Sequence, residues 1–180
     1  MICFTADTHF CHSNIIALSS KPFKAVEEMN QTLIQNWNSC VTDRDEIYIL
    51  GDFFFKGTGE EANNFLKNLK GKKYLIKGNH DNFVTFPDFD IRAFRWVKDY
   101  FVLDYQKRKF ILFHYPILEW QGFFKGAIHL YGHVHKAVKD PAQSERLDVL
   151  GKNAVNVGVD VNNFFPVSIE QIIESIAIRD

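Results

Sequence analysis

The chain has 180 residues, and its 46% hydrophobic and 24% charged residues are typical of a single globular domain. Lysine and arginine number 21 against 22 aspartates and glutamates, and the net charge of −1 argues against a long nucleic-acid duplex as partner. No apolar run reaches the roughly 18 residues of a membrane span, and the N-terminus lacks the pattern of a signal peptide. The three cysteines are odd in number and form no Cys-x-x-Cys pair, so we expect a reducing compartment and a cytoplasmic protein. Since the sequence has no membrane span, we also expect no membrane partner. The oligomeric state is left open.

Short apolar runs along the chain have the length and composition of β-strands: 2–6, 46–50, 73–77, 100–105, 109–113, 128–131 and 154–159. Between the early runs, apolar residues recur at helical spacing over 25–41 and 60–70. Ser168 and Gln171 form a capping box that predicts a last helix over 168–178.

The order of these elements predicts two packed sheets. Strands alternate with helices in the first half of the chain, which indicates parallel pairing. The second half is mostly consecutive strands, with a hairpin that turns at Gln106, Lys107 and Arg108. We therefore expect an α/β or α+β domain spanning residues 1–180, in which one sheet packs on another and helices lie outside.

Polar side chains follow five of the predicted strands. They are Asp7 with His9, then Asp52, Asn79, His114, and His133 with His135. One such aspartate is usually a turn or a helix cap, and one such histidine is usually a half-buried structural residue. Five repetitions favour a metal site instead, because sites in α/β sheets form beyond the carboxyl ends of strands. His133 and His135 lie two residues apart in an extended segment, so their rings face the same side.

The residue types indicate two divalent ions held without sulfur. Carboxylate, amide and imidazole ligands suit Mn²⁺, which we expect first, or Fe, Zn, Ni or Co. The seven candidate ligands are too many for one ion and suit two ions that share a bridging ligand. Two carboxylates offset only part of the charge of two dications. The site is therefore expected to attract an anionic phosphate and to lower the pKa of a bridging water.

The segments "DTH", "GD", "GNHD", "FHY" and "GHVH" occur in the order and approximate spacing of the motifs of calcineurin-like metallophosphoesterases. The resemblance spans residue 1 to about residue 165 and is strongest to small bacterial and phage phosphohydrolases of that family that lack a cap domain. It implies a four-layer α/β/β/α sandwich, in which two mixed sheets pack face to face and helices flank them.

The resemblance also assigns the polar residues to two metals. The ligands of the first metal would be Asp7, His9, Asp52 and His135. Asp52 would bridge to the second metal, whose other ligands would be Asn79, His114 and His133. His80 would act as general acid or transition-state stabiliser, and Asp81 would orient its ring.

The expected activity is hydrolysis of a phosphomonoester or a phosphodiester by attack of a metal-bridging hydroxide. The substrate is expected to be a small phosphate ester or a nucleotide-like molecule, and its candidate contacts are His12, Phe54 and Trp120. Helix capping or packing explains His12 equally well. Closure of the core is the simpler explanation for each aromatic ring in a chain with 18 phenylalanines.

Two alternatives stay open from the sequence: a non-catalytic scaffold of the same fold that binds a protein partner, and a nuclease acting on short oligonucleotides. A scaffold usually loses motif residues, whereas His80 and all the expected ligands are present.

Residues 57–62 fit the dinucleotide-binding pattern Gly-x-Gly-x-x-Ala, but Glu60 and Glu61 would occupy the place of a pyrophosphate. We therefore interpret the segment 57–62 as a loop and helix start. The basic run over 67–77 is expected to be a solvated helix end and turn.

Overall fold

The structure, a computed structural model, describes residues 1–135 and 147–178. Its first sheet has the strand order β4–β3–β2–β1–β9, with the bounds β1 (Ile2–Thr5), β2 (Glu46–Leu50), β3 (Lys72–Ile76), β4 (Val97–Lys98) and β9 (Val167–Ser168). β1 to β4 pair in parallel, and β9 pairs antiparallel to β1. The parallel pairing is the one expected from the alternation of strands and helices in the first half of the chain.

The second sheet has the order β5–β6–β7–β8, with the bounds β5 (Tyr100–Tyr105), β6 (Arg108–Phe113), β7 (Ile128–Tyr131) and β8 (Ala154–Asn156). β5 and β6 form the predicted antiparallel hairpin, whereas β6, β7 and β8 are parallel. Both sheets are therefore mixed, as expected. β8 ends earlier than the predicted 154–159 because the chain leaves the sheet for a short 3₁₀ helix that begins at Val159.

Four α-helices lie in the described part of the chain: α1 (Ser13–Leu18), α2 (Val26–Cys40), α3 (Gly59–Asn68) and α5 (Ile169–Ala177). The 3₁₀ helices are η1 (Asn82–Thr85), η2 (Ile91–Ala93), η3 (Phe123–Lys125) and η4 (Val159–Val161). The capping box at Ser168 is confirmed, and a second one at Thr58 opens α3, so 57–62 is the loop and helix start that we expected. No helix within these described residues is long and apolar enough to cross a membrane.

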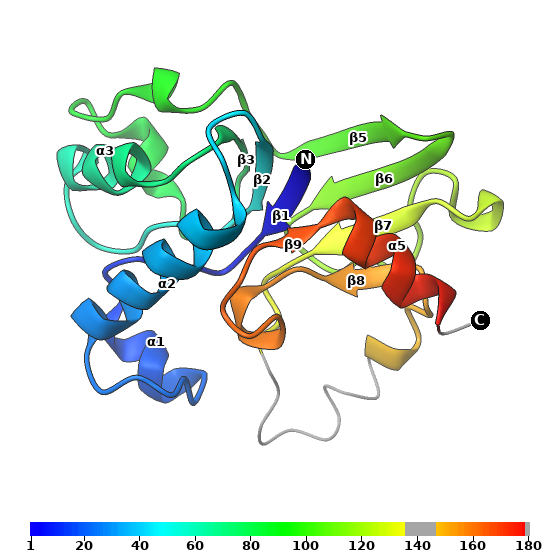
Figure 1. Cartoon of the computed structure of the whole chain (residues 1–180), viewed down its shortest axis with the longest axis horizontal. Coiled ribbons are helices and arrows are strands. Elements are labelled where there is room, and N and C mark those ends of the chain that lie inside the picture. The colour runs from blue at the N-terminus through cyan, green and yellow to red at the C-terminus, as the bar shows by residue number, and fades with distance from the viewer. Residues whose placement is uncertain (136–146, 179–180) are drawn as a thin grey trace.

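The layers pack through two apolar clusters. Figure 1 shows α1, α2 and α3 on one side of the first sheet and the second sheet on the other. Leu33 and Trp37 of α2 pack against the helix-facing side of the first sheet. Leu50 and Leu112 belong to the cluster between the sheets, which Ile172 of α5 helps to close. Each such buried side chain contributes about 1.5–3 kcal/mol, so these layers fix the strand ends relative to one another.

The outer face of the second sheet is covered by the segment that contains Trp120. Its side chain is 7% exposed, and its indole N–H donates a hydrogen bond to the Ala127 carbonyl at 2.8 Å. The ring lies 5.1 Å from the ring of His129, which is itself fully buried. The Trp120 ring therefore closes a core layer, and its contact with a substrate stays a prediction.

Candidate metal centre

The expected ligands meet where strands of both sheets end. Two groups of ligand atoms each lie within 4.8 Å of one another: group 1 is Asp7, His9 and His135, and group 2 is Asp52, His114 and His133. Every member follows the end of a strand, at β1, β2, β6 or β7. Because the packed layers hold these strand ends together, residues far apart in the sequence converge on one centre.

Asp52 belongs to group 2 but also lies close to His9 of group 1. Its Oδ2 atom is 3.6 Å from His9 Nε2 and 3.5 Å from His114 Nε2. Asn79 follows β3 and places its Oδ1 atom 3.2 Å from His114 Nε2, so it joins group 2. The structure thus brings together all seven residues singled out from the sequence, with Asp52 in the position of a shared ligand.

The backbone at the centre adopts an uncommon conformation. Asp7, His9, Asp52 and His133 have φ values of 58°, 47°, 54° and 67°. This left-handed region costs a residue with a side chain about 1–2 kcal/mol. Neighbouring segments hold these turns, since the Asp7 N–H donates to the Gly51 carbonyl at 3.0 Å and the His9 N–H to the Asp52 carbonyl at 2.9 Å. The fold therefore maintains local strain that aims the ligands at common points.

Glycines allow the ligand loops to approach each other closely. A Cβ atom at Gly132 would lie 2.5 Å from Ala6 Cβ and 2.7 Å from Asp7 Oδ2. One at Gly158 would lie 2.9 Å from the same carboxylate oxygen. A side chain at either position would therefore push the Asp7 carboxylate away from His9 and His135, the other members of group 1.

Burial and charge act differently on the two carboxylates. Burial raises the pKa of Asp7 to about 7, although His135 and His114 lower it in part. Burial also raises the pKa of Asp52, but its hydrogen bond to His114 and the nearby imidazoles outweigh burial and bring this pKa to about 2. Burial lowers the pKa of His9 to about 2, so its ring is neutral and its nitrogen is free to coordinate a cation.

The donor set fits divalent metal ions. His9 Nε2 is buried and has no hydrogen-bond partner in the described part of the chain, whereas buried polar atoms normally have one. His114 Nδ1 is 2.7 Å from the Leu50 carbonyl, and His135 Nδ1 is 2.6 Å from Asp160 Oδ2. When Nδ1–H donates outward in this way, Nε2 carries the lone pair that a metal needs.

A buried ion pair that the sequence reasoning missed supports His135. Asp160 accepts the hydrogen bond from His135 and pairs through its other oxygen with Lys21 Nζ. The side chains of Lys21 and Asp160 are 1% and 5% exposed. Asp160 directly follows the predicted strand 154–159, so the pattern that revealed the ligands also marked it, whereas nothing in the sequence marks Lys21.

Asp160→Asn is expected to weaken the metal affinity of group 1 by roughly 10- to 100-fold, because the amide orients His135 less strongly than the carboxylate does. Calorimetric titration of Mn²⁺ into chelator-stripped protein would measure the affinity. Asp104→Asn, which removes an exposed carboxylate paired with Lys109 at 2.7 Å, is the matched control.

The variant also leaves Lys21 buried without a counter-ion, which is destabilising by itself. Lys21→Met combined with Asp160→Asn removes that unpaired charge. The combined variant should recover thermal stability while the metal affinity stays low. Wild-type affinity in Asp160→Asn would show that Asp160 does not orient His135.

Asp81 occupies a different place from the one expected. Its buried carboxylate accepts hydrogen bonds from the backbone N–H groups of Asp52, Phe53 and Gly78, each at 2.8 Å. Burial raises its pKa to about 6 against the effect of these bonds. Among the described residues Asp81 makes no hydrogen bond to the His80 ring. The expected orienting role is therefore replaced by another one: Asp81 fixes the loops that carry the ligands of group 2.

His80 and His12 flank group 1 beside Phe55. Their ring centroids lie 5.5 Å and 5.3 Å from that of His9. His12 stacks on Phe55 at 3.7 Å, and burial lowers its pKa to about 4, so it packs at the inner rim of the centre. Phe54 is 1% exposed and packs in the core, yet it lines the small hollow beside His80, so its contact with a substrate stays a prediction. Phe55, whose ring lies 4.9 Å from that of His80, borders the centre.

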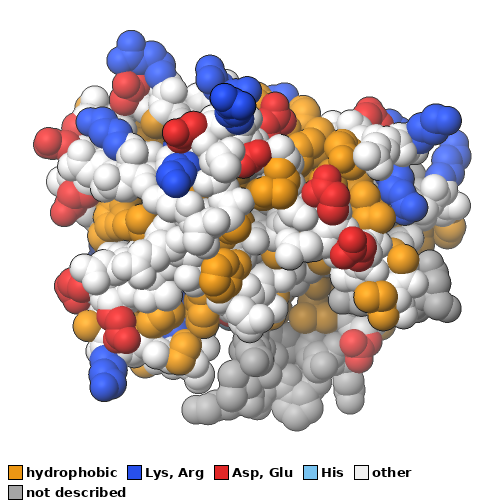
Figure 2. Space-filling view, in the orientation of Figure 1, with side chains coloured by type: hydrophobic (Ala, Val, Ile, Leu, Met, Phe, Trp, Pro, Cys, Tyr) orange, Lys and Arg blue, Asp and Glu red, His pale blue; other side chains and the backbone are white. Residues whose placement is uncertain are grey.

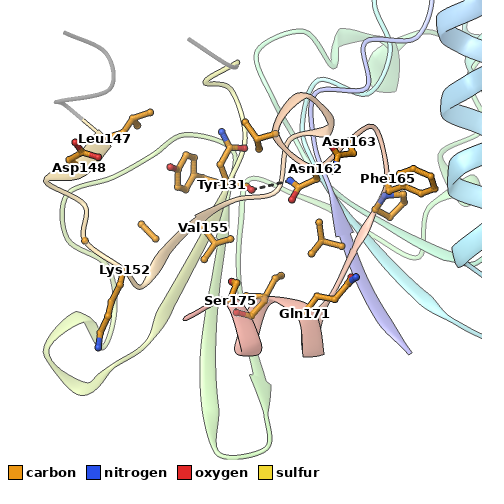
Figure 3. Close-up of a pocket in the computed structure, with 17 residues that line it drawn as sticks. Tyr131, Leu147, Asp148, Lys152, Val155, Asn162, Asn163, Phe165, Gln171 and Ser175 are labelled. Carbon is orange, nitrogen blue, oxygen red and sulfur yellow. Dashed lines mark hydrogen bonds between the residues drawn. The ribbon is translucent and has the colours of Figure 1, made fainter. Parts of the chain in front are cut away.

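A cavity of about 980 Å³ lies apart from the metal centre, bordered by β8, η4, β9 and α5 (Figure 3). Its lining includes Val155, Asn162 and Phe165 and none of the seven expected ligands. Asn162 Nδ2 donates to the carbonyls of Asn156 at 3.2 Å and Gly158 at 2.8 Å. The first of these bonds reaches the last residue of β8, and the lining joins β8 of the second sheet to β9 of the first, so this cavity lies at the junction of the two sheets.

Two ligand groups that share a carboxylate, placed at the strand ends of two packed mixed sheets, define a candidate dinuclear metalloprotein on an α/β sandwich. Residues 1–133 match the calcineurin-like phosphoesterases, and the chain belongs to that family. The resemblance inferred from the five sequence motifs is confirmed.

Several relatives match along most of their length. An uncharacterized protein of Methanocaldococcus jannaschii is 38% identical over 174 residues, which cover 95% of this chain and 88% of that protein. The gene 66 protein of Mycobacterium phage D29 is 26% identical over 182 residues, covering 87% and 86%. The crystal structure of a protein of unknown function from Aquifex aeolicus aligns with a TM-score of 0.73 at 26% identity, over 97% of this chain and 98% of that one. These matches are consistent with the small members of the family that lack a cap domain.

Proposed function

We propose that the protein is a metal-dependent hydrolase of small phosphomonoesters or phosphodiesters. The observation that carries this proposal is the pair of ligand groups joined by Asp52 in a calcineurin-like phosphoesterase chain. Two divalent ions, Mn²⁺ first and Fe, Zn, Ni or Co as alternatives, would supply Lewis acidity to the phosphoryl oxygens and lower the pKa of bound water. The three cysteines are free, which supports a reducing compartment such as the cytoplasm for this activity.

His80 is the residue that we assign to the leaving oxygen. Its backbone N–H donates to Asp52 Oδ1 at 2.9 Å, which holds it beside the centre. A hollow of about 140 Å³ borders His80 and is also lined by Phe55, Lys56 and Phe86. A leaving group placed in this hollow would have its oxygen within reach of the His80 ring, which would donate the proton as the bond to phosphorus breaks. The ring of Phe55 and the amine of Lys56 suit a nucleotide-like leaving group.

The test of the proposal is hydrolysis of bis(p-nitrophenyl) phosphate and p-nitrophenyl phosphate by chelator-stripped protein, with Mn²⁺ titrated back. We expect turnover to return with the metal, and the ratio of the two rates to assign diester or monoester preference. If the protein binds two metals and cleaves neither compound, its substrate range is narrow, and a panel of nucleotide esters would be tested next. A protein that binds no metal would favour the alternative of a non-catalytic scaffold.

His80→Ala should retain both metals and lose about 10²–10⁴-fold in turnover, the usual contribution of a general acid. The loss should be smaller for p-nitrophenyl esters than for alkyl esters, because p-nitrophenolate leaves without a proton. Metal content per chain and kcat for both kinds of ester would be measured together. Nearly full turnover of an alkyl ester by the metal-replete variant would remove His80 from the mechanism.

A further inference from the structure

A groove of about 720 Å³ lies at the end of the second sheet that is remote from the metal centre. It is bordered by the tip of the β5–β6 hairpin and by the loop that contains η3. Arg108 begins β6 and His114 follows its last residue, so the strand separates groove and centre by roughly 20 Å. We call this feature the hairpin groove and define it by Lys107, Arg108, Lys109, Trp120, Phe124 and Lys125.

Cations dominate the hairpin groove although the whole chain is nearly neutral. The cationic residues that line it are Lys107, Arg108, Lys109 and Lys125, and Glu119 is the acidic residue among the lining. Lys109 pairs with Asp104 at 2.7 Å, whereas the other three cations form no ion pair within the described part of the chain. Figure 2 shows lysine and arginine side chains gathered at the outer end of the β5–β6 hairpin. A local cluster of unpaired cations attracts a polyanion even when the net charge is close to zero.

An exposed aromatic ring stands beside these cations. Phe124 is 85% exposed, compared with 39% for Phe165. Its ring meets that of Phe123 edge-on at 5.1 Å, and Phe123 meets the buried Trp120 edge-on at 4.7 Å. The exposed ring is therefore mounted on the core and is available for stacking.

The backbone holds both sides of the groove in defined positions. Gly122 and Gly126 flank η3 in the left-handed region, with φ values of 80° and 74°, and the Lys125 N–H donates to the Gly122 carbonyl at 2.8 Å. At the hairpin tip, Gln106 and Lys107 have φ values of 47° and 64°. Glycine and asparagine are the residues usually found in such a turn. A long cationic side chain at this strained position places its amine at the edge of the groove, which points to a use for that amine.

We propose that the hairpin groove binds single-stranded nucleic acid, with phosphates at Lys107, Arg108 and Lys125 and a base stacked on Phe124. Cations interleaved with an open aromatic face are the combination that single-strand sites use. An acidic peptide would use the cations and leave the ring idle, and a bilayer surface would not fill a concave groove. Because the chain has no overall basic excess, the contact is limited to a short strand.

The experiment measures the anisotropy of a fluorescent oligothymidylate of about 12 nucleotides, a length within the range of single-strand sites. The full chain carries Mn²⁺ and His80→Ala, so that the oligonucleotide is not consumed if the centre cleaves it. The expected Kd is about 10⁻⁴–10⁻⁶ M at physiological salt. Phe124→Ala should weaken binding about tenfold. Lys107→Glu and Arg108→Glu should each reduce the slope of log K against log salt by about 0.7.

The controls are equivalent changes elsewhere on the surface: Lys67→Glu and Lys72→Glu in the basic run over 67–77, and Phe165→Ala. The thermal midpoint of each variant shows whether it is folded. The proposal is overturned if the oligonucleotide does not bind, if the control variants weaken binding equally, or if Phe124→Ala has no effect. It is also overturned if phosphatidylserine vesicles displace the oligonucleotide and bind more tightly. The assay needs no turnover, so its failure and the failure of the proposed phosphoesterase activity are distinguishable.

Discussion

Asp52→Asn is expected to reduce metal-dependent turnover by roughly a thousandfold or more. Asp52 Oδ2 lies between His9 Nε2 and His114 Nε2, so one carboxylate serves both ligand groups. Asparagine keeps the shape of the side chain, and its Oδ1 atom still accepts the hydrogen bond from the His80 backbone. The variant therefore removes the negative charge and replaces the shared Oδ2 atom with an amide nitrogen, which has no lone pair to offer a metal. Each 1.4 kcal/mol added to the activation free energy lowers the rate about tenfold. A loss of several kcal/mol of charge stabilisation in the transition state therefore accounts for the expected decrease.

Two measurements separate the causes of this loss. Metal content per chain after desalting should fall below that of the wild type, and kcat/KM for bis(p-nitrophenyl) phosphate should stay low at saturating Mn²⁺. Asp104→Asn removes an exposed carboxylate that is paired with Lys109 and should leave both quantities unchanged. A fully active Asp52→Asn protein with two bound metals would contradict the role of Asp52 as a shared ligand.

Most of the fold was predictable because the strands are short apolar runs and the longer helices repeat apolar residues at helical spacing. Helix α2 spans Val26–Cys40, close to the predicted 25–41, since its buried residues recur along one face. Helix α1 was missed because the six residues of Ser13–Leu18 are too few to show a helical period. β4 and β9 have two residues each and are defined by their neighbours in the sheet, which no local pattern reveals.

The candidate ligands were predictable because each closely follows the end of a strand, whereas the residues that support them depend on tertiary contacts. Asp81 was placed beside its sequence neighbour His80, but its carboxylate turns instead toward backbone N–H groups at the loop of Asp52. Lys21 reaches Asp160 across 139 positions of the sequence, a pairing that only the packed fold creates.

The choice among Phe53, Phe54 and Phe55 had no basis in the sequence, since three identical rings in a row show no alternation. The structure buries the first two, with exposed fractions of 0% and 1%, and leaves the third at the border of the centre. A bridge between Phe10 and Phe54 sets this register. Which ring borders the metal centre is therefore decided by the pairing of two loops that lie more than 40 positions apart.

Gly51→Ala is the stability change with the largest expected effect, because two costs add at one position. Gly51 has a φ of +88°, which an L side chain rarely adopts, so alanine there is strained by about 1–2 kcal/mol. Its Cβ would also lie 2.7 Å from His114 Cγ and 2.8 Å from the Gly78 Cα atom. Forcing a ring and a packed backbone apart adds about 1–3 kcal/mol, and the sum is a large part of the roughly 5–15 kcal/mol that stabilises a domain.

Gly151→Ala separates these two costs. Gly151 has a φ of +72°, but among the described residues, its two chain neighbours aside, no heavy atom lies within 4 Å of the Cβ position, so only the strain applies. Denaturant unfolding of the metal-free proteins should show a loss of about 1–2 kcal/mol for Gly151→Ala and a larger loss for Gly51→Ala. Gly51→Ala should also lose the metal bound by group 2, because a displaced His114 ring no longer donates to the Leu50 carbonyl that orients it. Equal losses of stability, with metal binding intact in both variants, would mean that His114 moves aside freely and that the close approach of Gly51 does not position it.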